Sequence, residues 1–195
     1  GARGRAEVLW LDRGGVARAR NRGVAWALDR DPRLTALFLL DGDDLVGPEA
    51  AARRLAALRA AQAARPDRRI GWVVADKQLF GAERRYVQTD EGFSPDAYLA
   101  ANLAQPSCLY DAAMLRAGLR WREEMRRGLE DWDFWLAAIA AGFEAAYTDR
   151  TVLLYRKLAG ARSSRNRRND AATLPGMRAR HAALFRPSAM LAAEH

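Results

Sequence analysis

The chain has 195 residues and a formal net charge of +8; 50% of its residues are hydrophobic and 29% are charged. This balance indicates one globular domain with a tail rather than a disordered chain, and the apolar runs are too short to span a membrane. The single cysteine, Cys108, excludes an internal disulfide and favours a reducing, cytoplasmic compartment, while the presence of only two histidines argues against a zinc site or a Ser-His-Asp triad.

Apolar periodicity predicts strands that alternate with helices. Strands are expected at residues 7–11, 34–40, 70–80, 86–88, 106–110, 143–147 and 152–155. Helices are expected at residues 16–30, 47–64, 112–117, 130–141 and 177–184, with a further short helix after Pro95. This alternation predicts an α/β fold with a mixed, mostly parallel sheet flanked by helices.

Three carboxylates, Asp41, Asp43 and Asp44, directly follow the apolar strand expected at 34–40. The carboxyl end of such a strand is where α/β sheets bind ligands, and Gly42 allows the backbone to turn tightly. Clustered carboxylates favour a hard divalent cation, Mg²⁺ or Mn²⁺. The alternative is an ordinary Asp/Gly turn without a ligand, which is common after strands.

A second carboxylate group, Glu130, Asp131 and Asp133, lies at the amino end of the last long predicted helix. The helix dipole favours ionised acids there, and a rigidly held carboxylate could act as a general base on a hydroxyl. The alternative is that these acids only cap the helix. Trp135 is expected in the core, whereas Trp132 either packs there too or stacks against a sugar ring.

The positive charge is concentrated near the carboxyl end of the chain. Residues 151–180 contain eight Lys or Arg against a single acid, a net charge of +7; the basic positions are 156, 157, 162, 165, 167, 168, 178 and 180. Such a segment favours phosphate, nucleic acid or an anionic membrane surface as a partner, or it is simply solvated. Because no aromatic interleaving or nucleic-acid motif accompanies the arginines, no nucleic-acid partner is expected.

Five stretches in a fixed order resemble the family 2 glycosyltransferases, which have the Rossmann-related GT-A fold. They are Gly15-Val-Ala-Arg-Ala-Arg-Asn-Arg-Gly; Leu39-Leu-Asp-Gly-Asp-Asp; Gln105-Pro-Ser-Cys-Leu-Tyr with Met114-Leu-Arg; Gly128-Leu-Glu-Asp-Trp-Asp-Phe-Trp with Gly142-Phe; and Tyr155-Arg-Lys. The resemblance places a GT-A-like domain at 1–158 and a basic loop with a short helix at 159–195. It implies an inverting, hexosyltransferase-type transfer from a nucleotide-diphosphate sugar to a hydroxyl of a glycan, lipid-linked or protein acceptor.

The resemblance also implies roles on the donor side of the site. Asp43 would bind the Mn²⁺ or Mg²⁺ ion that bridges the donor diphosphate, and Asp41 would contact the ribose or the metal shell. Asp44 would support both acids. Arg20 and Asn21 would help to form the nucleotide pocket.

On the acceptor side, Asp131 would be the general base, Glu130 would orient the acceptor or the donor, and Trp132 would contact the acceptor. Arg156 and Lys157, with Arg162, would begin a basic loop that covers the diphosphate. A cation and basic side chains suit this place, because the leaving diphosphate gains negative charge.

The sequence departs from the family pattern in two ways. The two strands that normally open the domain are absent and the chain begins with Gly, so we expect that the natural amino terminus is missing, with half of the nucleotide pocket. Lys157 stands where the family often has a metal-binding histidine. The resemblance therefore does not decide which metal binds or whether one is needed. Two alternatives remain: a non-catalytic sugar- or nucleotide-binding remnant of the fold, and a polyanion or inner-membrane-surface binder that acts through residues 151–180.

Overall fold

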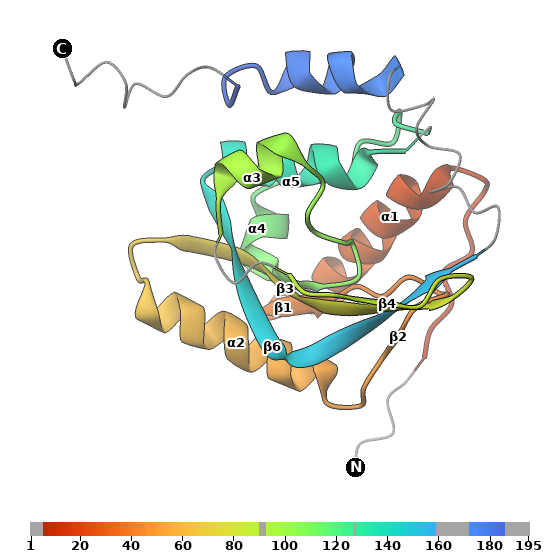
Figure 1. Cartoon of the computed structure of the whole chain (residues 1–195), viewed down its shortest axis with the longest axis vertical. Helices are drawn as coiled ribbons and strands as arrows, with labels where there is room; N and C mark the ends of the chain where they lie inside the picture. Colours follow the sequence, from red (N-terminus) through yellow and green to blue (C-terminus); the bar gives the residue numbers. More distant parts are fainter. Residues whose placement is uncertain (1–5, 90–92, 127, 159–171, 186–195) are drawn as a thin grey trace.

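The computed structural model describes residues 6–89, 93–126, 128–158 and 172–185 (Figure 1). The helices are α1 (Gly15–Arg30), α2 (Ala50–Ala64), α3 (Pro95–Ala100), α4 (Ala112–Arg116) and α5 (Glu130–Ala140). The strands are β1 (Ala36–Phe38), β2 (Leu45–Val46), β3 (Arg69–Gly81), β4 (Arg85–Val87), β5 (Leu109–Asp111) and β6 (Phe143–Lys157). Residues 172–180 are also helical and residues 181–185 are not, so the helix predicted at 177–184 lies several residues nearer the amino end than expected.

Most predicted elements are confirmed, and two differ in an informative way. The strands predicted at 143–147 and 152–155 are one long strand, β6. The strand predicted at 7–11 is wrong, because no described strand pairs with this segment and its side chains face solvent. Val8 is 72% exposed and Trp10 is 91% exposed. An apolar, β-favouring sequence therefore does not form a strand here without a partner.

The six-stranded sheet is mixed, with the order β1-β5-β3-β6-β2 and with β4 paired to β3. The expected mixed sheet flanked by helices is confirmed, but its described pairings correct the expectation of a mostly parallel sheet. Only the long β3–β6 pair is parallel, whereas the other pairs are antiparallel. The short β3–β4 turn imposes an antiparallel pair, whereas the other antiparallel pairs join strands that lie far apart in the chain.

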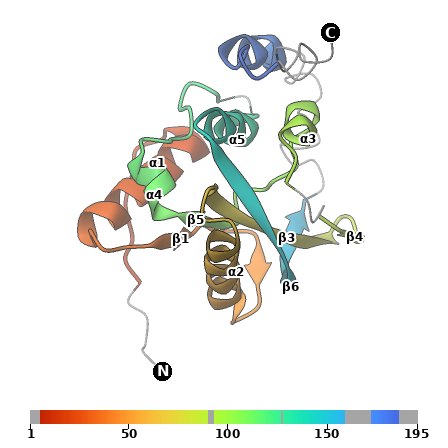
Figure 2. The same cartoon turned by 90° about the vertical axis from the view of Figure 1, so that its left-hand side faces the viewer.

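Helices cover both faces of this sheet (Figures 1 and 2). On one face α2 packs on β3, β5 and β6, where Leu58, Ile70 and Val73 are buried together. On the other face lie α1, α3, α4 and α5 over a larger cluster rich in aromatic side chains. The molecule therefore has three layers, and α5 belongs to the layer opposite α2.

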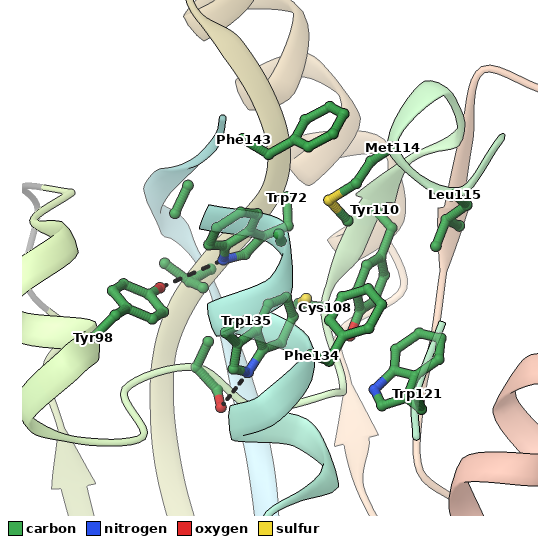
Figure 3. Close-up of a cluster of buried hydrophobic side chains, with 14 of the residues drawn as sticks. Trp72, Tyr98, Cys108, Tyr110, Met114, Leu115, Trp121, Phe134, Trp135 and Phe143 are labelled. Atoms are coloured by element: carbon green, nitrogen blue, oxygen red, sulfur yellow. Dashed lines mark hydrogen bonds between the residues drawn. The ribbon is translucent and has the colours of Figure 1, made fainter. Parts of the chain in front are cut away.

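Aromatic rings fix α5 to the sheet (Figure 3). Trp135 stacks on Trp72 of β3 with ring centroids 5.1 Å apart, and on Tyr110 of β5 at 5.6 Å. Phe134 stacks on Trp121 at 4.2 Å. Since aromatic pairs contribute roughly 0.5–1.5 kcal/mol each beyond their buried area, the start of α5 is held rigidly. Trp135 lies in the core as expected.

The helix at 172–180 packs against the outer side of α5. Met177 is fully buried with Trp132 and Leu136, and Leu174 and Phe185 pack against the same cluster. Part of the predicted 159–195 tail therefore rests on the domain, while residues 159–171 lie outside the described residues. In the described part of the chain, no helix combines the length and the apolar character needed to cross a bilayer.

Candidate functional site

A cleft of about 750 Å³ collects most of the site residues that the sequence predicts. Its acids come from the loop after β1 and from the first turn of α5, and its basic side chains come from α1 and from strands β3, β4 and β6. The charged lining residues are Arg20, Asp41, Asp43, Lys77, Arg85, Glu130, Asp131, Arg156 and Lys157. This volume is typical of small-molecule sites.

The loop that carries Asp41 and Asp43 is fixed by hydrogen bonds to the segment before β5. Leu39 N donates to Cys108 O at 3.0 Å, and Asp41 N donates to the hydroxyl of Ser107 at 3.0 Å. Asp44 N then closes a turn on Asp41 O at 3.0 Å. The acids therefore emerge from a turn that is tied to the segment before β5.

Asp44 lies beneath this turn and does not line the cleft. Its side chain is 4% exposed; Oδ2 accepts from Ser107 Oγ at 2.9 Å and Oδ1 accepts from Arg156 N at 3.1 Å. Burial raises the pKa of Asp44 despite these hydrogen bonds, and the charges of Asp41 and Asp43 add to the rise. Asp44 thus joins the carboxylate loop to the end of β6.

Arg54 supports the same turn from the opposite face of the sheet. Its Nη1 donates to Ser107 O at 3.0 Å and its Nε to Thr151 Oγ1 at 3.1 Å, while Nη2 has no partner among the described residues. Arg54 is only 1% exposed, and burial lowers its pKa. Sequence analysis missed this residue, because an arginine in an Ala/Arg-rich helix carries no sign that it points inward.

Arg20 joins the carboxylate loop to α5. Its Nη2 lies 2.9 Å from Oδ1 and 3.0 Å from Oδ2 of Asp41, and its Nη1 lies 3.5 Å from Oε1 of Glu130. Burial alone would lower the pKa of Arg20, but the charge and hydrogen bonds of Asp41, with the charge of Glu130, outweigh it and raise the pKa. The predicted donor-side and acceptor-side acids therefore share one cation.

Asp131 stands in the first turn of α5 and faces the cleft. Its Oδ2 accepts from Asn102 Nδ2 at 2.9 Å, and its Oδ1 accepts from the backbone N of Trp132 at 2.8 Å. The preceding Leu129 has φ 65°, a left-handed conformation that is strained for leucine. Its side chain packs on the Trp132 cluster, which holds this entry to the helix in place.

The carboxylates differ in their availability to a metal ion. Asp41 is paired with Arg20 and Asp44 is buried, whereas Asp43 is exposed and its carboxylate has no partner among the described residues. Nowhere in the described ranges do three or more His, Cys, Asp or Glu side chains gather closely enough to hold a metal. A single available carboxylate, that of Asp43, fits an ion that takes its remaining ligands from a bound phosphate and water, as Mg²⁺ often does.

Four cations stand opposite the acids. Lys157 and Arg156 were predicted; Lys77 and Arg85 were not. Burial lowers the pKa of Lys77 most, and the positive charges of Lys157 and Arg85 lower it further. The run of three polar residues, Asp76, Lys77 and Gln78, inside the mostly apolar strand at 70–80 was the available sequence signal for Lys77. Arg156 also donates Nε to Asp43 O at 2.9 Å, which fixes its guanidinium beside the loop.

Besides Asp44, two further predicted site residues do not line the cleft. Asn21 is not in the cleft lining; it donates Nδ2 to Trp121 O at 2.8 Å and accepts from Trp121 N at 3.0 Å. The expectation that Trp132 stacks on an acceptor is corrected, because Trp132 is 7% exposed and its Nε1 donates to Tyr98 O at 2.7 Å. Its i, i+4 partner Leu136 belongs to the same buried cluster, so this face of α5 points away from the cleft.

Asp133 is likewise turned away from the cleft. It is 3% exposed, and its Oδ1 lies 2.8 Å from Arg180 Nη2 and 3.1 Å from His181 Nε2. Burial alone would raise the pKa of Asp133, but the hydrogen bonds from His181 and Arg180 and their charges lower it to about 2. Asp133 thus holds the carboxyl-terminal helix on α5.

No known family profile matches the chain, and no curated protein matches it. Solved structures do match the chain. S. aureus TarS 1–349 in complex with UDP-GlcNAc has a TM-score of 0.55 and 17% identity, over 80% of this chain and 43% of that chain. The same protein in complex with UDP has a TM-score of 0.51 and 16% identity, over 74% of this chain and 40% of that one.

The structure of S. aureus TarS without a stated ligand has a TM-score of 0.50 and 17% identity, over 78% of this chain and 26% of that chain. The present chain therefore spans less than half the length of each of these structures. TarS is a glycosyltransferase, and at this level of identity the likeness shows the fold alone. The chain has a glycosyltransferase-type α/β fold.

Proposed function

We propose that this chain carries the nucleotide-sugar site of an inverting glycosyltransferase, which moves a hexose-type sugar from a nucleotide-diphosphate donor to an acceptor hydroxyl. The observation that carries this proposal is the meeting of two carboxylate groups in one cleft, where Arg20 bonds both Asp41 and Glu130. A transfer between two substrates needs both halves of the chemistry within reach of each other. The fold of TarS, which binds UDP and UDP-GlcNAc, supports the same class of donor.

The donor diphosphate would lie between Asp43 and the basic side chains. Asp43 would hold Mn²⁺ or Mg²⁺ together with the diphosphate oxygens, and the bound ion would supply positive charge for the leaving group. Arg156, Lys157 and Lys77 line the same cleft and would contribute further charge. Their effect is greatest as the glycosidic bond breaks, when the diphosphate becomes more negative.

Asp131 would accept the proton of the incoming hydroxyl. One oxygen accepts from Asn102 and the other from the backbone of Trp132, so the carboxylate orientation is fixed while each oxygen keeps a further lone pair. General-base help of this kind contributes about 10²–10⁴ in rate. The acceptor would be a glycan, lipid-linked or protein hydroxyl, and Glu130 would orient one of the substrates.

The test combines a binding measurement and a rate measurement on the same chain. Calorimetry with UDP, with and without MnCl₂, reports the donor site; release of sugar from UDP-GlcNAc and other UDP-sugars reports turnover. Asp131→Asn is expected to lower turnover by about 10²-fold or more with UDP affinity unchanged. The matched control is Asp96→Asn, an exposed acid in the first turn of α3 outside the cleft. A rate for Asp131→Asn within a few-fold of the parent would rule out the base.

The alternative of a non-catalytic binding remnant predicts UDP binding without turnover in the same experiment. Among the four described basic residues of 151–180, the alternative of a polyanion or membrane-surface binder can draw on Lys157 and Arg178. Arg156 bonds the carboxylate loop and Arg180 is paired with Asp133; Arg162, Arg165, Arg167 and Arg168 lie outside the described residues.

A further inference from the structure

A second, smaller cavity of about 160 Å³ opens beside the cleft, between β3, β6, β4 and α3. We call it the ring pocket. Its lining includes Lys77, Val87, Phe93, Tyr98, Asn102 and Leu103. No role was predicted for any of them.

The ring pocket has an apolar, aromatic side and a polar side. Phe93 and Tyr98 form an aromatic pair with ring centroids 5.6 Å apart, and Trp72 supports both from behind at 5.9 Å. The polar side includes Lys77 and Asn102, and no described residue hydrogen-bonds or ion-pairs with the ammonium of Lys77. A sugar ring has matching chemistry, since its C–H face packs on aromatic rings while its hydroxyls need polar partners.

The size of the ring pocket limits what it can hold. An apolar cavity of about 150 Å³ is large enough for benzene. The ring pocket therefore has room for one six-membered ring but not for a nucleoside, which needs the larger cleft.

The ring pocket also communicates with the proposed site of proton transfer. Lys77 and Asn102 line both the pocket and the cleft, and the amide of Asn102 lies 2.9 Å from Asp131 Oδ2. A ring in the pocket would thus present its edge toward the cleft next to Asp131.

We propose that the ring pocket binds a pyranose ring of a glycan acceptor and brings one of its hydroxyls to Asp131. This inference rests on the proposed function for the role of Asp131, and it selects a glycan among the three acceptor classes. It assigns acceptor recognition to Phe93, Tyr98 and Lys77 in place of the buried Trp132.

The test fills the ring pocket without touching the cleft. Val87→Trp places a bulky side chain in the pocket from β4, a strand position that favours aromatic residues. Leu45→Trp in β2 is the matched control, because Leu45 is half exposed and lines neither cavity. Leu103→Phe is a second filling variant, and thermal unfolding identifies any variant that fails to fold.

The probes are a panel of methyl hexopyranosides, with cyclohexanol as a ring that lacks sugar hydroxyls, and saturation-transfer NMR measures their binding with and without UDP. The proposal expects millimolar glycoside binding to the parent and to Leu45→Trp, about tenfold weaker binding to Val87→Trp, and unchanged UDP affinity. Equal glycoside binding by Val87→Trp, no glycoside binding to the parent, or binding of cyclohexanol alone would each overturn it.

The two proposals fail in different ways. If UDP binds and UDP-sugars turn over, but the glycosides bind Val87→Trp as tightly as the parent, the ring pocket is not the acceptor site and the proposed function stands. If the glycosides bind in the ring pocket while UDP does not bind at all, the proposed function fails and the pocket remains a pyranose site.

Discussion

Arg20 and Asp41 form the central ion pair of the cleft: a single Nη2 nitrogen lies 2.9 Å and 3.0 Å from the two carboxylate oxygens. The Arg20 side chain is 9% exposed and that of Asp41 is 34% exposed. A carboxylate that the sequence predicts as a metal ligand therefore already has a cation, which must be displaced or shared before Asp41 can contact a metal ion.

Arg20→Met is expected to destabilise the fold and to tighten metal binding. Removing the guanidinium deletes the hydrogen bonds to Asp41, which should lower the free energy of unfolding by about 1–3 kcal/mol. It also releases Asp41, so Mn²⁺ should bind more tightly in the absence of nucleotide. Denaturant unfolding and electron paramagnetic resonance of free Mn²⁺ measure the two effects. Arg22→Met, exposed on the same helix, is the control. Unchanged Mn²⁺ affinity would exclude Asp41 as a ligand.

Asp43→Asn and Asp44→Asn should separate the two remaining acids of the loop. Asp43→Asn removes the exposed carboxylate, so Mn²⁺ should no longer strengthen UDP binding. Asp44→Asn keeps the shape of a buried side chain whose raised pKa shows that its charge is disfavoured; its amide can donate to Ser107 while its oxygen still accepts from Arg156 N. We expect a stability change within about 1 kcal/mol and retained Mn²⁺ dependence. Loss of that dependence in Asp44→Asn alone would reverse the assignment. Calorimetry with UDP at fixed MnCl₂ reports both.

Arg54 should matter to the donor site although it lies on the far side of the sheet. It bonds Ser107 O, and the hydroxyl of Ser107 bonds Asp41 N and Asp44. Arg54→Met removes a buried charge that has no carboxylate partner, so the stability loss should stay below about 2 kcal/mol. Because Ser107 loses its support, UDP affinity should fall about tenfold.

The control for Arg54→Met is Arg53→Met, which removes an exposed arginine paired with Glu49. Arg54→Lys keeps the charge but not the two-sided reach to Ser107 and Thr151, so it should restore little of the affinity. Equal UDP affinity in Arg54→Met and Arg53→Met would make Arg54 a purely structural residue.

The position of each carboxylate group could be predicted from local sequence rules, whereas their meeting in one site was implied by the resemblance to the family 2 glycosyltransferases. Asp41 and Asp43 follow an apolar strand, so they are expected at the carboxyl edge of the sheet. Asp131 begins an apolar helix, so it is expected at the amino end of that helix. The longest predicted helices and the strand at 70–80 are confirmed within a few residues, since their periodicity spans many positions.

The missed residues depend on tertiary structure. Trp132 and Trp135 are equally apolar, and nothing local shows that the face of Trp132 is covered by a helix that begins some forty residues later. The inward direction of Arg54 depends on its hydrogen bond to the carbonyl of Ser107, a residue far away in the chain. The segment at 7–11 has the composition of a strand, but pairing needs a neighbour that composition does not supply.

Asp133 should make the docking of the carboxyl-terminal helix sensitive to acid. Its ordinary pKa of 3.8 falls to about 2 in the folded chain, so the ionised carboxylate stabilises the fold above pH 3.8. This stabilisation, about 2 kcal/mol, is lost as the pH falls from 3.8 toward 2. Asp133→Asn should remove it at neutral pH, flatten the acid limb of the stability curve, and speed hydrogen exchange in residues 172–185. Glu124→Gln is the surface control. An unchanged acid limb in Asp133→Asn would show that another carboxylate carries the acid sensitivity.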